Sequence, residues 1–337
     1  MKSLAIVVPC YNEEAVLAET ASRLLDILDG LAHRDKIASS SFVYFVDDGS
    51  TDQSWSRIQA EKHRDSRIRG IKLSRNCGHQ NALLAGLLTV TEDMVVSVDA
   101  DLQDDLSVIE QMVDCCHVGK DIVFGVRENR SADSWLKRNT AESFYLLLRW
   151  LGVNVVFNHA DFRLMSRRAL EALRDYGEVN LFLRGIVPTI GLPSATVAYQ
   201  RKSRLAGKTK YSYRRMLSLA LNGITSFSVV PLRVIAILGV AIFLGSLSLT
   251  VWVVWVWLFS PDVVPGWASS VLPMYFLGGV QLLSIGVLGE YVSKIYMETK
   301  RRPRFIIETT TWSQAVSAAG YSHQAVSAAP TVFQDRH

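Results

Sequence analysis

The sequence predicts an α/β protein with a mostly parallel sheet, followed by two membrane-spanning helices near the C-terminus. Two observations lead to this fold class. Up to about residue 130, short apolar runs alternate with longer runs of helical periodicity, which is typical of parallel strands joined by crossover helices. Nearer the C-terminus, two stretches without charged residues are each long enough to cross a bilayer.

The first part of the chain is expected to alternate strands and helices. The expected strands are residues 4–10, 42–50, 68–74, 94–101 and 121–127, and the expected helices are residues 13–31, 52–64, 79–90 and 106–118. The strand segments are apolar without strict alternation, which indicates strands that are covered on both faces. A sheet with helices packed on both sides follows from this pattern.

The two apolar stretches are residues 234–259 and 267–289, and the turn between them contains Asp262 but neither lysine nor arginine. Positive residues stay on the cytoplasmic side of a membrane. Here they flank the pair at Arg201, Lys202, Arg204, Lys208, Lys210, Arg214, Arg215 and Arg233, and again at Lys294, Lys300, Arg301, Arg302 and Arg304. We therefore expect a cytoplasmic membrane crossed twice, with both termini in the cytoplasm. The alternative is a buried helical hairpin in a soluble protein.

The composition argues against several other classes of protein. A net charge of +4 is too small to indicate a nucleic-acid partner. The four cysteines show neither a C-x-x-C pair nor a zinc spacing, so neither disulfides nor a structural metal are expected. The N-terminal run LAIVVP is too short for the core of a secretory signal.

Polar residues follow the strands, and the ends of parallel strands share one edge of a sheet. In an open sheet the ligand site lies at that edge, where the strand order reverses. If the first and fourth strands are neighbours, as in a 3-2-1-4 order, residues 9–13 lie beside residues 99–101. The motif VDDGSTD at 46–52 would alone be interpreted as a turn with a helix cap, but together with PCYNE it indicates part of this site.

The stretch DADLQDD, residues 99–105, has the chemistry of a metal site. The side-chain oxygen atoms of Asp99, Asp101 and Gln103 are suitable ligands for Mg²⁺ or Mn²⁺. Phosphates of the substrate usually complete the coordination of such an ion. Carboxylates this close repel one another, and a bound cation would offset the repulsion. Asp104 and Asp105 are instead interpreted as favourable charges at the start of the next helix.

The motifs PCYNEE, VDDGSTD, RNCGHQNALLAG and DADLQDD occur in this order, and with them the chain resembles an inverting family 2 glycosyltransferase of the GT-A fold. Four further segments are similar to the polyprenyl-phosphate glycosyltransferases: DFRLMSRR at 161–168, FLRG at 182–185, RLAGKTKY at 204–211 and GEYVSKIYMETKRRP at 289–303. That group includes bactoprenol glucosyltransferases, undecaprenyl-phosphate aminoarabinose transferases and, more distantly, dolichol-phosphate mannose synthases.

The resemblance implies roles for individual residues. For binding the nucleotide sugar it implies Pro9, Tyr11, Glu13, Asp48 and Asp99, with Asp48 at the nucleobase edge. As ligands of Mg²⁺ or Mn²⁺ it implies Asp99, Asp101 and Gln103, which match a D-x-D-x-Q pattern. For catalysis it implies Asp101, Arg127, Arg138, Arg204 and Lys210. Arg127 and Arg138 match positions that hold the acceptor phosphate, and the last two match a mobile basic loop.

The implied reaction is metal-dependent transfer of a sugar to undecaprenyl phosphate at the cytoplasmic membrane face, for modification of cell-envelope glycans. UDP-glucose is the favoured donor, and UDP-formamidoarabinose, UDP-N-acetylhexosamine and GDP-mannose are alternatives. A processive polysaccharide synthase is disfavoured because the sequence has no Q-x-x-R-W motif. A non-catalytic membrane scaffold is the alternative from a different class.

The expected organisation has four parts. Residues 1–210 form the cytoplasmic GT-A domain, 211–231 a juxtamembrane amphipathic segment, 232–292 the transmembrane hairpin, and 293–337 a basic segment with a disordered tail after about Thr309. Residues 134–153 are expected to form an amphipathic helix at the membrane interface. Because two spans enclose little of a long polyprenyl chain, a homo-oligomer is a further hypothesis.

Overall fold

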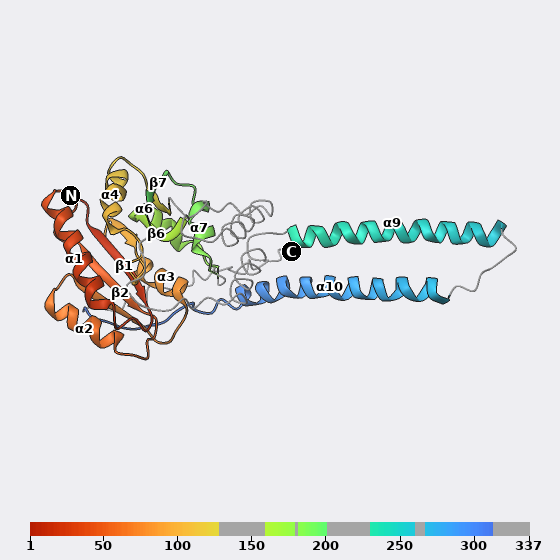
Figure 1. Ribbon diagram of the computed structural model, residues 1–337, viewed down its shortest axis with the longest axis horizontal. Coiled ribbons are helices and arrows are strands. Elements are labelled where there is room, and N and C mark those ends of the chain that lie inside the picture. The colour runs from red at the N-terminus through yellow and green to blue at the C-terminus, as the bar shows by residue number, and fades with distance from the viewer. Residues whose placement is uncertain (128–158, 179–180, 201–229, 260–266, 313–337) are drawn as a thin grey trace, which may run out of the picture.

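The computed structural model describes residues 1–127, 159–178, 181–200, 230–259 and 267–312. An α/β domain lies at one end of the molecule, and two long helices project from it side by side (Figure 1). The expected interfacial helix at 134–153, and all of the juxtamembrane segment at 211–231 except its last two residues, lie outside the described residues.

The sheet has eight strands in the order β7-β5-β6-β4-β1-β2-β3-β8. Their bounds are β1 Leu4–Cys10, β2 Phe42–Asp47, β3 Ile68–Leu73, β4 Met94–Ser97, β5 Ile122–Arg127, β6 His159–Ser166, β7 Ser194–Tyr199 and β8 Ile307–Thr310. The neighbouring strands β4, β1, β2 and β3 are all parallel. This confirms the predicted mostly parallel sheet, in which the first and fourth strands are neighbours.

Strand β6 was not predicted from the sequence. It lies antiparallel between β4 and β5, and β7 then extends the sheet parallel to β5. The four parallel strands are linked by one helix each, whereas β6 reaches the sheet only after a long connection from β5. A strand that enters from so far along the chain leaves no βαβ rhythm in the sequence.

Helices cover both faces of the sheet, as expected. On one face lie α1 (Leu17–His33), α2 (Ser54–Arg64) and α4 (Ile109–His117), the last preceded by the 3₁₀ turn η1 (Leu106–Val108). On the other face lie α3 (His79–Thr89), α6 (Arg167–Arg174) and α7 (Leu183–Thr189). Strand β1 is fully buried and sends alternate side chains into the two cores, so it lies at the centre of a three-layer sandwich.

The prediction of a disordered tail after about Thr309 is wrong for the residues up to Trp312. Strand β8 pairs antiparallel with β3 at the edge of the sheet. Thr311 Oγ1 accepts a hydrogen bond from the Gly70 amide at 2.8 Å, and the Trp312 ring packs edge-on against Tyr44 with centroids 5.3 Å apart. The chain that leaves the second long helix therefore returns to the α/β domain and completes its sheet.

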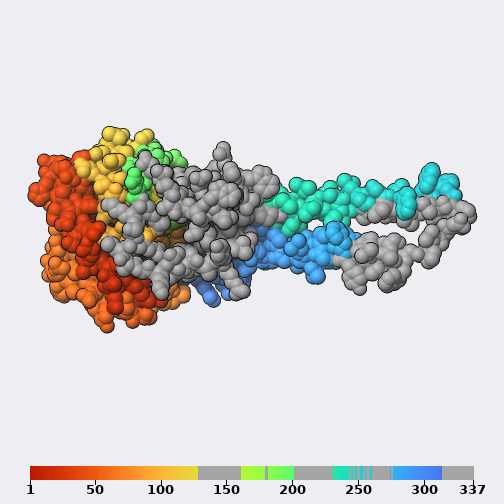
Figure 2. Space-filling view, viewed as in Figure 1, coloured from red at the N-terminus to blue at the C-terminus, as the bar shows by residue number. Residues whose placement is uncertain are grey.

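The two projecting helices are α9 (Val230–Phe259) and α10 (Trp267–Thr299). Among the described residues, Phe276–Thr299 is one stretch that is long and apolar enough to cross a membrane, and Leu232–Ile242 is a shorter apolar helix. Two predicted spans are thus not confirmed by length and hydropathy. Both helices extend beyond the α/β domain in the space-filling view (Figure 2). In the described part of the chain, the exposed large hydrophobic residues outside this pair are only Met1, Tyr11, Val118 and Ile306.

Candidate active site

The loops that follow β1 and β2 brace each other at the carboxyl edge of the sheet. Ser50 Oγ accepts a hydrogen bond from the Asn12 amide at 3.0 Å, and Asn12 Oδ1 accepts one from the Thr51 amide at 2.9 Å. The Glu13 amide in turn donates to Ser54 Oγ at 3.0 Å. The segments PCYNE and VDDGSTD, predicted to belong to one site, are therefore hydrogen-bonded into one wall, with Tyr11 39% exposed beside it.

Asp48 ties this wall to the loop after β3. Its two carboxylate oxygens accept backbone hydrogen bonds from Cys77 at 2.7 Å and Gly78 at 2.9 Å. Gly49 adopts φ +67°, and a Cβ there would lie 2.6 Å from the Asn76 nitrogen, so only glycine permits this approach. Desolvation raises the Asp48 pKa, and these hydrogen bonds partly offset the rise. The role of Asp48 at the nucleobase edge stays a prediction.

A group of carboxylates lies where the chain leaves β4. The Asp99 side chain is 37% exposed, Gln103 is buried, and Asp101 Oδ1 accepts a hydrogen bond from the Gln103 amide at 3.3 Å. Desolvation raises the pKa of Asp99 to about 6; His79 opposes the shift, and the carboxylates of Asp161, Asp104 and Asp101 add to it. Negative charge is therefore incompletely balanced around Asp99.

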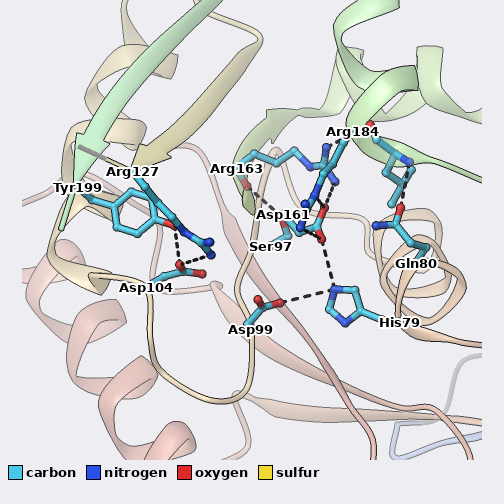
Figure 3. A network of polar contacts seen from close by, with 11 residues as sticks. His79, Gln80, Ser97, Asp99, Asp104, Arg127, Asp161, Arg163, Arg184 and Tyr199 are labelled. Carbon is cyan, nitrogen blue, oxygen red and sulfur yellow. Dashed lines mark hydrogen bonds and ion pairs between the residues drawn. The ribbon is translucent and has the colours of Figure 1, made fainter. Parts of the chain in front are cut away.

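His79, the first residue of α3, bridges this group to β6 (Figure 3). Its Nε2 lies 3.5 Å from Asp99 Oδ1 and 3.6 Å from Asp161 Oδ2. Burial alone would lower the His79 pKa, but the hydrogen bond with Asp161 and the charge of Asp99 outweigh it and raise the pKa. These contacts favour the protonated imidazole, which lies between the two carboxylates.

Asp161 is the most strongly paired carboxylate in the described cleft. Its side chain is 5% exposed and contacts Arg184 on α7 at 3.0 Å and the fully buried Arg163 at 3.4 Å. Desolvation would raise its pKa, but Arg184, His79 and Arg163 hold it well below its usual range. Gln80 Oε1 also accepts a hydrogen bond from the Leu183 amide at 2.9 Å, which fixes α7 against α3.

Arg127 ends β5 and lies at the opposite end of this network (Figure 3). Its Nε donates to the Tyr199 hydroxyl at 3.1 Å, and that hydroxyl donates to Asp104 Oδ1 at 2.5 Å. Arg127 Nη2 also lies 3.7 Å from Asp104 Oδ1. Asp104, predicted to be only a favourable charge at a helix start, is therefore buried and contacts one of the predicted catalytic arginines.

A divalent cation fits the chemistry of this donor set. In the described ranges, no three His, Cys, Asp or Glu side chains converge as a ready metal cage. Mg²⁺ and related ions are, however, usually held by one or two carboxylates together with substrate phosphates and water. Desolvation raises the pKa of Asp99, and the neighbouring carboxylates of Asp161, Asp104 and Asp101 raise it further, so a bound cation would offset like charges here.

The structure places most of the predicted site residues at one sheet edge. Pro9, Tyr11, Glu13 and Asp48 lie at the ends of β1 and β2, Asp99, Asp101 and Gln103 follow β4, and Arg127 ends β5. Arg138, Arg204 and Lys210 lie outside the described residues.

Sequence reasoning assigned no role to Asp161, Arg163 or Arg184, although it used their motifs for the resemblance. One signal was available. In DFRLMS, the charged residues Asp161 and Arg163 alternate with apolar ones, and side chains two apart on a strand share a face. A charged pair on one face of a buried strand indicates a polar site beneath the sheet edge rather than a solvated surface.

The fold and this site define a class: an α/β domain with clustered carboxylates and arginines at the carboxyl ends of its parallel strands, the edge at which open sheets of this kind bind their ligands. Residues 5–174 match the model of Glycosyl transferase family 2. The chain belongs to this family, and it is a glycosyltransferase with a GT-A-like α/β fold.

Full-length relatives extend the match. The chain is 48% identical to the uncharacterized glycosyltransferase YkoT of Bacillus subtilis (strain 168), covering 93% of this chain and 94% of that one. It is 38% identical to the bactoprenol glucosyl transferase of Shigella phage SfX, covering 91% and 99%. Glucosyl-3-phosphoglycerate synthase from Mycobacterium tuberculosis, solved with Mn²⁺, UDP and phosphoglyceric acid, matches at 16% identity with a TM-score of 0.43, covering 66% and 76%.

Proposed function

We propose that this glycosyltransferase moves a sugar from a nucleotide donor to a polyprenyl phosphate at the cytoplasmic face of a membrane. The observation that carries the proposal is the meeting of two kinds of charge at one sheet edge. Carboxylates cluster after β4, where a cation and a diphosphate would bind, and the guanidinium of Arg127 lies beside them, where a second phosphate would bind. The near full-length similarity to bactoprenol glucosyl transferases supports a polyprenyl phosphate as that second substrate.

On the donor side, Asp99, Asp101 and Gln103 would hold Mg²⁺ or Mn²⁺, with Pro9, Tyr11, Glu13 and Asp48 around the nucleotide. When bound, such an ion acts as a Lewis acid and stabilises negative charge on the departing diphosphate. The chain's own part is placement, because the braced loops after β1, β2 and β3 hold the pocket wall in one geometry. His79 would keep Asp99 oriented from the other side.

On the acceptor side, Arg127 would grip the lipid phosphate, together with Arg138, Arg204 and Lys210. A phosphate oxygen is already anionic at neutral pH, so its attack on the anomeric carbon needs no strong general base. Catalysis then rests on alignment of the nucleophile and stabilisation of charge. Arginine suits this task because its planar fork binds phosphate through two N–H groups.

The membrane part of the proposal rests on α9 and α10. Both are longer than a bilayer core requires at 1.5 Å per residue, and their described outer surfaces are apolar and exposed. We propose that both helices span the membrane, although only one stretch meets the length and hydropathy criterion among described residues. Residues 1–210 would then form the cytoplasmic domain, 211–231 the juxtamembrane segment, 232–292 the hairpin and 293–337 a second cytoplasmic segment. A homo-oligomer remains part of the proposal.

UDP-glucose is the proposed donor, since the relatives that carry a substrate name are described as glucosyl transferases. UDP-formamidoarabinose, UDP-N-acetylhexosamine and GDP-mannose are the alternatives.

The test is a transfer assay in membranes that contain the full chain, with radiolabelled UDP-glucose, undecaprenyl phosphate and Mn²⁺ or Mg²⁺. We expect label in the lipid fraction for the unaltered protein and for Asp114→Asn, a carboxylate paired with Lys36 on the surface. Asp101→Asn, which keeps the side-chain shape, is expected to reduce the rate at least a hundredfold. A lipid fraction without label across all four donors would reject the proposed acceptor.

A further inference from the structure

We infer that Tyr199 is a positioning residue that holds the guanidinium of Arg127 in the orientation needed to bind the acceptor phosphate. This inference rests on the proposed function, because it assigns Arg127 to the acceptor. It concerns a residue that the motif comparison did not single out. Tyr199 ends β7 and lies directly beside Arg127 in the register of the parallel pair β5 and β7.

The hydroxyl of Tyr199 is fully used by two partners. It accepts a hydrogen bond from Arg127 Nε at 3.1 Å and donates one to Asp104 Oδ1 at 2.5 Å. One hydrogen bond and one ion pair of Arg127 thus converge on one side, since Asp104 Oδ1 also lies 3.7 Å from Arg127 Nη2. The chain of Asp104, Tyr199 and Arg127 is the left-hand part of the network in Figure 3.

The ring of Tyr199 is itself tightly packed. It is 2% exposed and packs edge-on against Phe162, with centroids 5.4 Å apart and planes at 90°. A buried tyrosine ring has little conformational freedom left to lose. An arginine side chain, in contrast, has four rotatable bonds and loses much rotamer freedom when it is fixed. Tyr199 therefore reduces the ordering that phosphate binding would otherwise require of Arg127.

The contacts that Arg127 makes with described residues leave part of its guanidinium for a ligand. Its Nε–H is directed to the tyrosine, and Nη2 is near Asp104, so two of the five N–H groups face protein partners nearby. The side chain is still 29% exposed. A held arginine with exposed N–H groups is the form in which a phosphate is bound in a bidentate way.

Tyr44 provides a matched control from the same sheet. Its hydroxyl also accepts a bond from an arginine, Arg69 Nη1 at 2.5 Å, and donates to a carboxylate, Glu92 Oε1 at 2.7 Å. Its ring is 1% exposed. This triad lies against Trp312 and strand β8, among residues that the proposed reaction does not use. Removal of either hydroxyl therefore breaks the same kind of buried contact, but only one of the two lies beside the cleft.

The experiment compares Tyr199→Phe with Tyr44→Phe in the full-length enzyme in detergent or nanodiscs, with kcat and KM measured separately for donor and polyprenyl phosphate. For Tyr199→Phe we expect kcat/KM for the lipid phosphate to fall about tenfold, the effect of one hydrogen bond to a charged group, with the donor KM unchanged. For Tyr44→Phe we expect both values within about twofold of the unaltered enzyme, although it loses a comparable contact.

A double-mutant cycle with Arg127→Lys separates positioning from packing. Lysine lacks the guanidinium Nε–H that donates to the Tyr199 hydroxyl. Tyr199→Phe is therefore expected to change kcat/KM for the lipid phosphate little in the Arg127→Lys background. An equal loss in both backgrounds would overturn the inference, as would a loss that affects donor and acceptor in proportion or is matched by Tyr44→Phe. If the unaltered enzyme transfers no sugar to any polyprenyl phosphate, the proposed function itself fails; unchanged kinetics of Tyr199→Phe in an active enzyme rejects only the role of Tyr199.

Discussion

Arg184 holds Asp161 through two contacts: its Nε lies 3.2 Å from Oδ1, and its Nη2 lies 3.0 Å from Oδ2. This bidentate contact joins α7 to β6. Asp161 is buried, and it also contacts Arg163 and His79. These partners balance its negative charge, so the Asp161 carboxylate stays ionised. Asp99, on the other side of the same imidazole, has no ion pair with an arginine among the described residues, so a strongly paired carboxylate lies beside one that contacts His79.

Loss of the Arg184 contact is expected to destabilise the protein. Arg184→Gln removes the ion pair and leaves Asp161 with Arg163 and His79 as its remaining charged partners, at a cost of about 2 kcal/mol. The measurement is the melting temperature of the full chain in detergent. Arg23→Gln is the control, because Arg23 forms an exposed pair with Glu19, and such pairs contribute less than about 1 kcal/mol. Equal melting temperatures for the two variants would contradict the importance of the contact between Arg184 and the buried Asp161.

The pH dependence of stability should report Asp99. Its pKa of about 6 in the folded protein lies above the ordinary value of 3.8, so between these pH values the folded state binds more protons than the unfolded state. Its contribution to the free energy of unfolding therefore falls as the pH rises from about 4 to about 6 and stays low above that window. Asp99→Asn is expected to raise the melting temperature of the metal-free protein at pH 7.5, but much less at pH 4.5.

Mn²⁺ is expected to reverse the order of the melting temperatures of the unaltered protein and Asp99→Asn at pH 7.5. At pH 7.5, Mn²⁺ with UDP is expected to stabilise the unaltered protein and to have a smaller effect on Asp99→Asn, because the ion binds the ionised carboxylate. The same stabilisation should weaken as the pH falls below 6. Equal shifts in both proteins would indicate that Asp99 does not hold the ion.

The C-terminal segment that follows α10 should contribute to the stability of the α/β domain. Trp312→Ala removes a ring that packs against Tyr44 and lies over Arg69, with the guanidinium 5.5 Å from the ring centroid, and is expected to cost about 2 kcal/mol. The measurement is again the melting temperature, with the exposed residue Thr309→Ala as control. A neutral Trp312→Ala would mean that this part of the chain only rests on the sheet.

Much of the fold could be predicted from the sequence, because β1 to β4 are consecutive and each is followed by a helix. Their apolar runs and polar ends were sufficient to place Asp48 and Asp99 at one edge. Two features could not be predicted in this way. β6 enters antiparallel after a long connection and carries Asp161 and Arg163 into the cleft, and β8 joins from beyond α10. Pairing between segments distant in sequence depends on tertiary packing, which local periodicity does not record.

Asp48 provides the last test. Its two backbone partners make it possible to distinguish a role in holding the loop after β3 from direct contact with the nucleobase. Asp48→Asn keeps the size of the side chain but turns one acceptor into a donor that faces the amide of Cys77 or Gly78. We expect the loop after β3 to loosen and the dissociation constant for UDP to rise at least tenfold, as measured by calorimetry with Mn²⁺ present. Hydrogen exchange of the Cys77 and Gly78 amides should accelerate even without nucleotide. If UDP binds more weakly but hydrogen exchange of these two amides is unchanged, Asp48 is assigned to the nucleobase instead, because the substitution would then affect the ligand and not the loop.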